Sequence, residues 1–146
     1  MADDITISQI TSSSDKYQAV WELREEILRK PLGLSLKNED LGRDQIDTIM
    51  IAECAAELIA CLMLQQKGDK VVQLRQMAVS NAWQGKGIGR QLVLAAEKYC
   101  SEQGYNKITL HARKVAVGFY RGLGYTVAGD EFTEVGIPHL MMEKNI

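Results

Sequence analysis

The hydrophobic positions of the first third of the chain follow two different periods. Alternating apolar residues over 3–10 predict a short strand. A helical period follows and should end near Pro31 and Gly33, while Arg24 interrupts its apolar face. We expect Arg24 to form a salt bridge, with a reach toward a substrate site as the alternative. Residues 34–46 are polar and predict an irregular connection with a short helical turn.

The remainder of the chain alternates between strand-like and helix-like segments. Residues 48–54, 57–66 and 70–79 predict three consecutive strands, with a hairpin turn at Gly68-Asp69. A strongly amphipathic helix follows and should end at Gly104. The later segments predict a strand, a helix and two final strands over residues 107–112, 114–123, 125–128 and 138–144.

The third of the consecutive strands contains an irregularity. Val72 and Leu74 share one parity along the strand, whereas Met77 and Val79 share the other. A strand that keeps one face buried cannot change parity without an extra residue. We therefore predict a β-bulge near Arg75–Gln76, which would turn the end of the strand away from its next neighbour and open a cleft.

Length and composition point to one cytoplasmic domain over residues 1–146, and the strand and helix segments favour an α/β (α+β) fold. The formal net charge is -2 and no basic run is present, which argues against nucleic-acid binding. The acidic start lacks the pattern of a signal peptide, and no apolar stretch approaches the roughly 20 residues of a membrane span. Cys54, Cys61 and Cys100 have apolar neighbours and no CxxC spacing, so we interpret them as small buried side chains.

Three glycines alternate at the entrance of the amphipathic helix, at positions 85, 87 and 89. Glycines let backbone N–H groups approach a ligand, and a helix start carries unpaired N–H groups and partial positive charge. Lys86 and Arg90 add positive charge, so the segment predicts a phosphate site, with a tight loop that binds nothing as the alternative. A Walker loop is absent, and Arg90 stands where a dinucleotide fingerprint needs a glycine.

Several motifs, in order along the chain, resemble those of the GNAT acetyltransferase superfamily. Residues 84–89 (QGKGIG) resemble its Q/RxxGxG/A signature, and the preceding LRQMAVS is similar to its LxxLAV strand. Residues 119–125 (FYRGLGY) are similar to its FYxxLGF segment, and the tail FTEVGIPHLMMEK is a form seen in many bacterial members. Asn81, where many members carry proline, is a departure confined to a turn.

The resemblance implies a GNAT-like fold that uses acetyl-CoA and no metal. Its central sheet would be mixed, mostly antiparallel and six- to seven-stranded, flanked by helices, with a splayed strand pair that forms the CoA cleft. The backbone of Met77 and Val79 would pair with the pantetheine arm, and the amide near Met77 or Ala78 would face the oxyanion. The implied pyrophosphate-binding residues are Gln84, Gly85, Lys86, Gly87, Ile88, Gly89 and Arg90.

Acetyl transfer to an amine also needs proton donors and acceptors. Tyr120 matches the family's tyrosine acid, which would protonate the departing thiolate; the alternative is a core aromatic on the apolar helical stripe. His111 and His139 are candidates for the base, although a lone histidine is more often a structural hydrogen-bonding residue. Glu134 is a solvated loop charge or attracts a cationic amine.

We therefore expect an acetyl-CoA-dependent N-acetyltransferase whose primary amine acceptor attacks the thioester directly. The alternative is a non-catalytic GNAT-like module that binds acyl-CoA or mediates protein contacts. The acceptor would be a small molecule or a peptide amine, and neither a nucleic acid nor a membrane is expected as a partner. The sequence leaves open the acyl chain, the acceptor and the oligomeric state, with a homodimer as one alternative.

Overall fold

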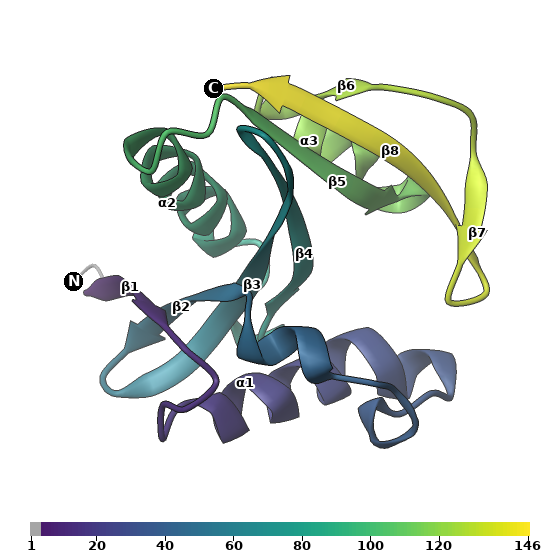
Figure 1. Cartoon of the computed structure of the whole chain (residues 1–146). Helices are drawn as coiled ribbons and strands as arrows, with labels where there is room; N and C mark the ends of the chain where they lie inside the picture. The colour runs from purple at the N-terminus through teal and green to yellow at the C-terminus, as the bar shows by residue number, and fades with distance from the viewer. Residues whose placement is uncertain (1–3) are drawn as a thin grey trace.

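A computed structural model describes residues 4–146 of the chain (Figure 1). The strand expected over 3–10 is present as β1. Residue 3, the first of the expected range, lies outside the described residues. The elements in chain order are β1 (Ile5–Ile10), α1 (Tyr17–Arg24), η1 (Glu25–Arg29), η2 (Lys30–Leu32), η3 (Leu36–Asn38), η4 (Gly42–Gln45), β2 (Thr48–Cys54), β3 (Glu57–Gly68), β4 (Val71–Val79), η5 (Asn81–Trp83), α2 (Ile88–Glu102), β5 (Lys107–Arg113), η6 (Lys114–Ala116), α3 (Val117–Gly122), β6 (Thr126–Val127), β7 (Phe132–Glu134) and β8 (Ile137–Asn145).

Over residues 4–146 the strands form one sheet of eight strands, in the order β1-β2-β3-β4-β5-β8-β6, with β7 paired to β8. Strands β4 and β5 pair in parallel and the other neighbours pair antiparallel, which confirms the expected mixed sheet. The sheet has one strand more than expected. Strand β7 folds back on β8 through Val135 (φ 46°) and Gly136 (φ 78°), and a valine in this conformation is an uncommon turn residue that the sequence does not reveal.

Helices cover both faces of the sheet. Leu92, Val93 and Ala96 of α2 share a buried cluster with Val117 and Tyr120 of α3. On the other face, Val20 of α1 packs in a second cluster against side chains of β2, β3 and β4. Figure 1 shows α1 and α2 on opposite sides of β2–β4, whereas β5 and β8 diverge from this half of the sheet.

The first helix is less regular than its period predicts. After α1 the chain makes a π-helical turn, η1, and a 3₁₀ turn, η2, and it leaves the helix at Gly33 with φ 70°. Arg24 forms the expected salt bridge, because its Nη1 donates to Asp44 Oδ2 at 2.7 Å. The Arg24 side chain does not line the cleft that opens between β4 and β5. Glu25 and Arg29 of the π turn are also buried, and their partners lie in the segment that follows.

Strands β4 and β5 run side by side for only four residues. Their pairing extends from Val71–Lys107 to Leu74–Leu110 and then stops. At the same point the register between β3 and β4 shifts, and Gln76 adopts a positive φ of 53°. The predicted bulge is therefore confirmed, and its consequence is a sheet that splits between β4 and β5.

Candidate active site

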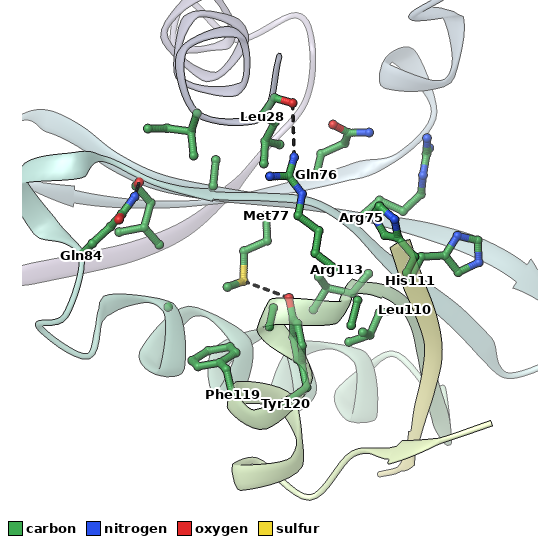
Figure 2. Close-up of a pocket in the computed structure, with 18 of the residues that line it drawn as sticks. Leu28, Arg75, Gln76, Met77, Gln84, Leu110, His111, Arg113, Phe119 and Tyr120 are labelled. Atoms are coloured by element: carbon green, nitrogen blue, oxygen red, sulfur yellow. Dashed lines mark hydrogen bonds between the residues drawn. The ribbon is translucent and has the colours of Figure 1, made fainter. Parts of the chain in front are cut away.

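The split between β4 and β5 forms a cleft of about 910 Å³ (Figure 2). Its walls come from β4, the start of α2, the end of β5, α3, the π turn η1 and the β7–β8 hairpin. The lining runs from the glycine-rich loop to the β7–β8 hairpin, so an extended ligand can lie between the strands. All three predicted catalytic residues, Tyr120, His111 and His139, line it.

One wall of the cleft is the free edge of β4. Beyond Leu74 this edge has no strand partner among the described residues, so its backbone groups face the cleft. Met77, Ala78 and Val79 line the cleft as predicted, and the Val79 carbonyl accepts a hydrogen bond from Gln84 Nε2 at 3.0 Å. An unpaired strand edge can bind an extended chain by adding it as a further strand.

The glycine-rich loop closes one end of the cleft. Gly85 (φ 76°) and Gly87 (φ 80°) adopt left-handed conformations, and no atom lies within 4 Å of a Cβ placed on either. Gly89 differs, because its φ is not positive and a Cβ on it would lie 3.3 Å from Met77 Cε, a tight contact with the flexible end of that side chain. Helix α2 starts at Ile88, and its first N–H groups have no partner within the helix.

Most of the predicted pyrophosphate residues lie at this end of the cleft. Gln84, Gly85, Gly87, Ile88, Gly89 and Arg90 line it. Lys86 is an exception, because its ammonium lies 5.1 Å from the ring centroid of Trp83 and outside the lining. Backbone N–H groups, the helix start and Arg90 thus make this end suited to an anion.

Tyr120 lies in the middle of the cleft wall on α3. Its hydroxyl points toward β4 and donates to Met77 Sδ at 3.8 Å, a weak contact that a better acceptor could replace (Figure 2). Burial raises the pKa of Tyr120 to about 12, so the phenol stays protonated over the physiological range. The ring also packs edge-on against Phe119 and Tyr125, so Tyr120 is an aromatic residue of the core whose hydroxyl lies in the cleft wall.

His111 and His139 meet at Glu134. His111 Nδ1 lies 3.0 Å from Glu134 Oε1, and His139 Nε2 lies 3.7 Å from Glu134 Oε2. A carboxylate only accepts hydrogen bonds, so His111 Nδ1 is the donor to Glu134. The other ring nitrogen, Nε2, is the one that Glu134 does not contact. The buried His139 donates from Nδ1 to the Ile137 carbonyl at 2.9 Å, which fixes its ring in the hairpin.

The structure adds cleft residues that the sequence did not indicate. Arg113, two residues after His111 on β5, reaches across the cleft to the Leu28 carbonyl at 3.3 Å. Arg29 donates to the same carbonyl at 3.1 Å and pairs with Glu39. A charged side chain on a helix or at a strand end is ordinary in sequence, so only the spacing from His111 could have pointed to Arg113.

Two further features of the described residues bear on the chemistry. Burial raises the pKa of Cys61 to about 12 and that of Cys100 to about 11, so both remain thiols as their apolar neighbours predict. Between residues 4 and 146, no group of three or more His, Cys, Asp or Glu side chains could hold a metal ion. The helices of this part of the chain are too short or too polar to cross a membrane.

Comparisons with known proteins agree with this geometry. Residues 16–146 match the acetyltransferase (GNAT) domain. The chain is 35% identical over 138 residues to YjcF of Bacillus subtilis strain 168, an uncharacterized N-acetyltransferase, with 93% of this chain and 97% of YjcF covered. Escherichia coli ElaA is 21% identical and has a TM-score of 0.85, with 97% of this chain and 99% of ElaA covered. PaiA N-acetyltransferase of Thermoplasma acidophilum, solved with coenzyme A, is 16% identical with a TM-score of 0.76 over 98% of this chain and 99% of PaiA.

Proposed function

This chain belongs to the GNAT acetyltransferase family, and we propose that it transfers the acetyl group of acetyl-CoA to a primary amine. The observation that carries the proposal is the arrangement of the cleft. An anion-binding helix start, an unpaired strand edge and a phenol hydroxyl follow one another along it. A pyrophosphate, an extended pantetheine arm and a thioester require these groups in the same order.

We expect coenzyme A to occupy the cleft in one orientation. Its pyrophosphate would bind the amides from Gly85 to Gly89, where two positive φ angles leave open space. The pantetheine amides would pair with the edge of β4 from Met77 to Val79, as an added strand does. The complex of PaiA with coenzyme A supports this assignment through the shared fold.

The reaction begins with the acceptor amine, which must be neutral to attack. His111 Nε2 would accept the first proton from the ammonium group, with Glu134 holding the ring through Nδ1. The amine nitrogen then bonds to the thioester carbon, and the oxygen gains negative charge near the Met77 or Ala78 amide. Collapse of the tetrahedral intermediate breaks the carbon–sulfur bond and expels the thiolate, which takes a proton from the Tyr120 phenol. The nitrogen then gives up its second proton, which restores the phenol and leaves a neutral amide.

Tyr120 would deliver the proton that the thiolate takes. Its pKa of about 12 makes transfer to a thiolate uphill, because an ordinary thiol has a pKa near ~8.5. The burial that raises the phenol pKa would act on a thiolate in the same cleft, and it raises the thiol pKa in the same direction. Proximity favours the transfer, and the 3.8 Å contact of the hydroxyl with Met77 Sδ competes with it only weakly.

The second candidate is a GNAT-like module that binds acyl-CoA without turnover. A coenzyme A release assay over a library of amines, run beside thermal melting with coenzyme A, separates the two. We expect a rise in melting temperature, about 2.7 kcal/mol of stabilisation at ~100 times the dissociation constant, and amine-dependent release of coenzyme A. Stabilisation without release on any amine would favour the binding module, and no stabilisation would remove both candidates.

A further inference from the structure

Arg113, a cleft-lining cation on β5, has no carboxylate partner among the described residues. Arg90 has no ion pair there either, but it lies in the first turn of α2 beside the glycine-rich loop. Arg113 Nη2 donates to the Leu28 carbonyl at 3.3 Å, and no ion pair involves its guanidinium within residues 4–146. Burial, and then the charge of Arg29, lower the pKa of Arg113. A guanidinium carries five N–H donors, so most of its hydrogen-bonding capacity is unused.

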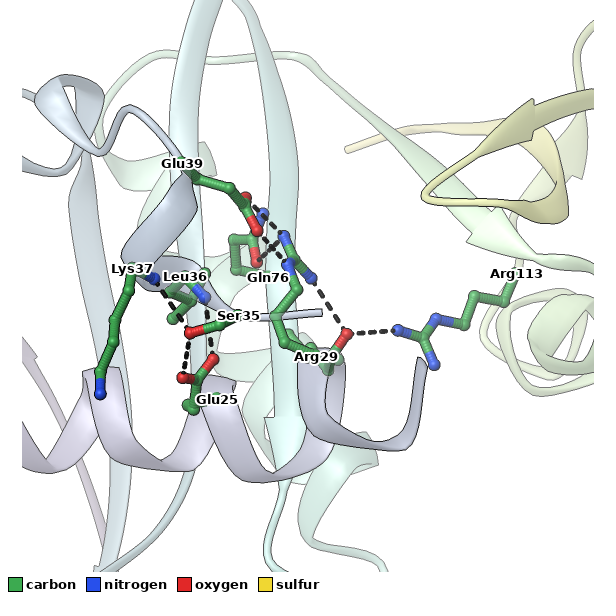
Figure 3. Close-up of polar contacts among 9 residues, drawn as sticks. Glu25, Arg29, Ser35, Leu36, Lys37, Glu39, Gln76 and Arg113 are labelled. Carbon is green, nitrogen blue, oxygen red and sulfur yellow. Dashed lines mark hydrogen bonds and ion pairs between the residues drawn. The ribbon is translucent and has the colours of Figure 1, made fainter. Parts of the chain in front are cut away.

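The neighbouring Arg29 has a guanidinium whose charge is paired with a carboxylate in the same region. Its Nε and Nη2 bind the two oxygens of Glu39 at 2.6 and 3.1 Å, while its Nη1 donates to the Leu28 carbonyl (Figure 3). The two arginines thus share one carbonyl, and a carboxylate compensates only Arg29. A partly buried cation without a counter-charge is costly, and an anion entering the cleft beside Arg113 would relieve that cost.

The groups around Arg113 indicate which anion this would be. In coenzyme A the negative charges belong to the phosphates, which the glycine-rich loop would bind, and the pantetheine arm is uncharged. An anion at the end of β5 therefore has to come from the acceptor. Arg113 and His111 point from the same face of β5, roughly 7 Å apart along the strand, and His139 lies opposite Arg113 on β8.

We propose that the acceptor is an amino carboxylate, a small molecule whose carboxylate binds Arg113 while its amine faces His111 and Glu134. The proposal rests on the proposed acetyl transfer and narrows its substrate class. It disfavours polyamines and aminoglycosides, which carry no carboxylate. It also explains why one end of the cleft holds a free cation beside an imidazole–carboxylate pair.

The test uses free amino acids, each paired with its own carboxamide. The carboxamide has the less basic amine, so more of it is neutral and it should react faster if the carboxylate is not recognised. Acetyl-CoA consumption is measured for wild type, Arg113→Gln and Arg121→Gln. The last variant removes the same charge from an exposed position on α3, outside the cleft lining.

We expect wild type to prefer the carboxylates by about 10- to 100-fold in kcat/KM, the range expected for one hydrogen-bonded charge pair. Arg113→Gln should abolish that preference through the KM of the acceptor, with the KM of acetyl-CoA unchanged, and Arg121→Gln should behave as wild type. Equal or faster reaction of the carboxamides would overturn the inference while acetyl transfer stands. A raised KM for acetyl-CoA in Arg113→Gln would assign the guanidinium to coenzyme A instead. Binding of coenzyme A without transfer to any amine would remove the proposed function, and this inference with it.

Discussion

The two ends of the cleft are built in different ways. At the coenzyme end the groups that face the ligand are mostly backbone, from one continuous segment that includes the end of β4, the glycine-rich loop and the start of α2. At the acceptor end they are side chains from η1, β4, β5 and the β7–β8 hairpin, which are far apart in sequence. The first end is formed by the local conformation of one segment. The second end forms only when folding brings distant segments together.

This difference predicts how each end responds to substitution. A backbone site fails when a side chain fills it or when its φ angles become unfavourable, so glycine positions control it. In a site made of side chains, each substitution removes the function of one group, and the remaining groups keep their positions. The largest single-residue effects should therefore come from the loop, and smaller, separable effects from the acceptor end.

Gly87→Val tests the backbone site. The residue caps α2 with φ 80°, and its added methyl groups would occupy open space at the helix start. We expect the affinity for coenzyme A to fall by roughly 10³-fold, because about two charge-assisted hydrogen bonds to the pyrophosphate are lost. Isothermal titration with coenzyme A measures the change.

Gly104→Val is the matched control for that variant. It lies beyond the other end of the same helix, with φ 91° and no atom within 4 Å of a Cβ. Both variants should lower the melting temperature, because both force a β-branched residue into a left-handed conformation. If Gly104→Val weakened coenzyme A binding as much as Gly87→Val, the loss would reflect destabilisation of the fold, and the loop assignment would fail.

Tyr120→Phe tests the centre of the cleft, between the two ends. Removing the hydroxyl loses a weak 3.8 Å contact with Met77 Sδ, so the melting temperature should change little. The turnover number should fall by roughly 10²-fold, and less with a thioester of a more acidic thiol, because the lost group is a proton donor. Single-turnover measurements of acetyl transfer report this step.

Tyr125→Phe, in the same aromatic cluster, should have the opposite effect to Tyr120→Phe. The Tyr125 hydroxyl donates to Glu97 Oε2 at 3.0 Å and lies outside the cleft lining. This variant should lose stability and keep its turnover. Unchanged chemistry in Tyr120→Phe would assign Tyr120 to packing alone.

His111→Gln tests the acceptor end. Its ring faces the cleft, and water that reaches this half-exposed position can accept the proton in its place. We expect a loss of roughly tenfold in kcat/KM at neutral pH, smaller than for most general bases, with a weaker dependence of rate on pH. His139→Gln should instead lower stability, since its ring is buried and holds the Ile137 carbonyl. If His139→Gln lowered kcat/KM more than His111→Gln does, His139 would be the base and His111 the structural residue.

The same contrast between the ends explains what the sequence could predict. The alternation of Val72, Leu74, Met77 and Val79 encodes the bulge, because burial of one face is a local constraint on parity. Glycine at positions 85 and 87 likewise permits the positive φ angles found there. These local signals suffice for seven of the eight strands, for the split and for the loop.

The acceptor end could not be predicted in this way. The pairing of Arg29 with Glu39 and the contact of Arg113 with Leu28 join residues that no short motif links. Strand β7 depends on a turn at Val135 that sequence preferences disfavour. Even His111, which the sequence indicates as a candidate base, acquires its partner Glu134 only through that hairpin.

Glu25→Gln tests the segment that supports the acceptor end, and its effect should be the smallest. The buried Glu25 carboxylate accepts hydrogen bonds from Ser35 Oγ at 2.6 Å and from the Leu36 amide at 2.8 Å, which tie the connection after the first helix to the π turn (Figure 3).

The Ser35 hydroxyl, and then the Leu36 amide, lower the pKa of Glu25. A carboxylate with a lowered pKa stabilises the fold above its unfolded pKa, near ~4.3, and this contribution is lost as the pH falls through the folded value. At neutral pH the variant should therefore melt a few degrees below wild type, and the two melting temperatures should converge as the pH falls below about 4. Glu26→Gln, the exposed neighbour whose carboxylate pairs with Lys30, should melt like wild type throughout. A difference between Glu25→Gln and wild type that persists undiminished in acid would show that shape and packing, rather than the charge of Glu25, hold this segment in place.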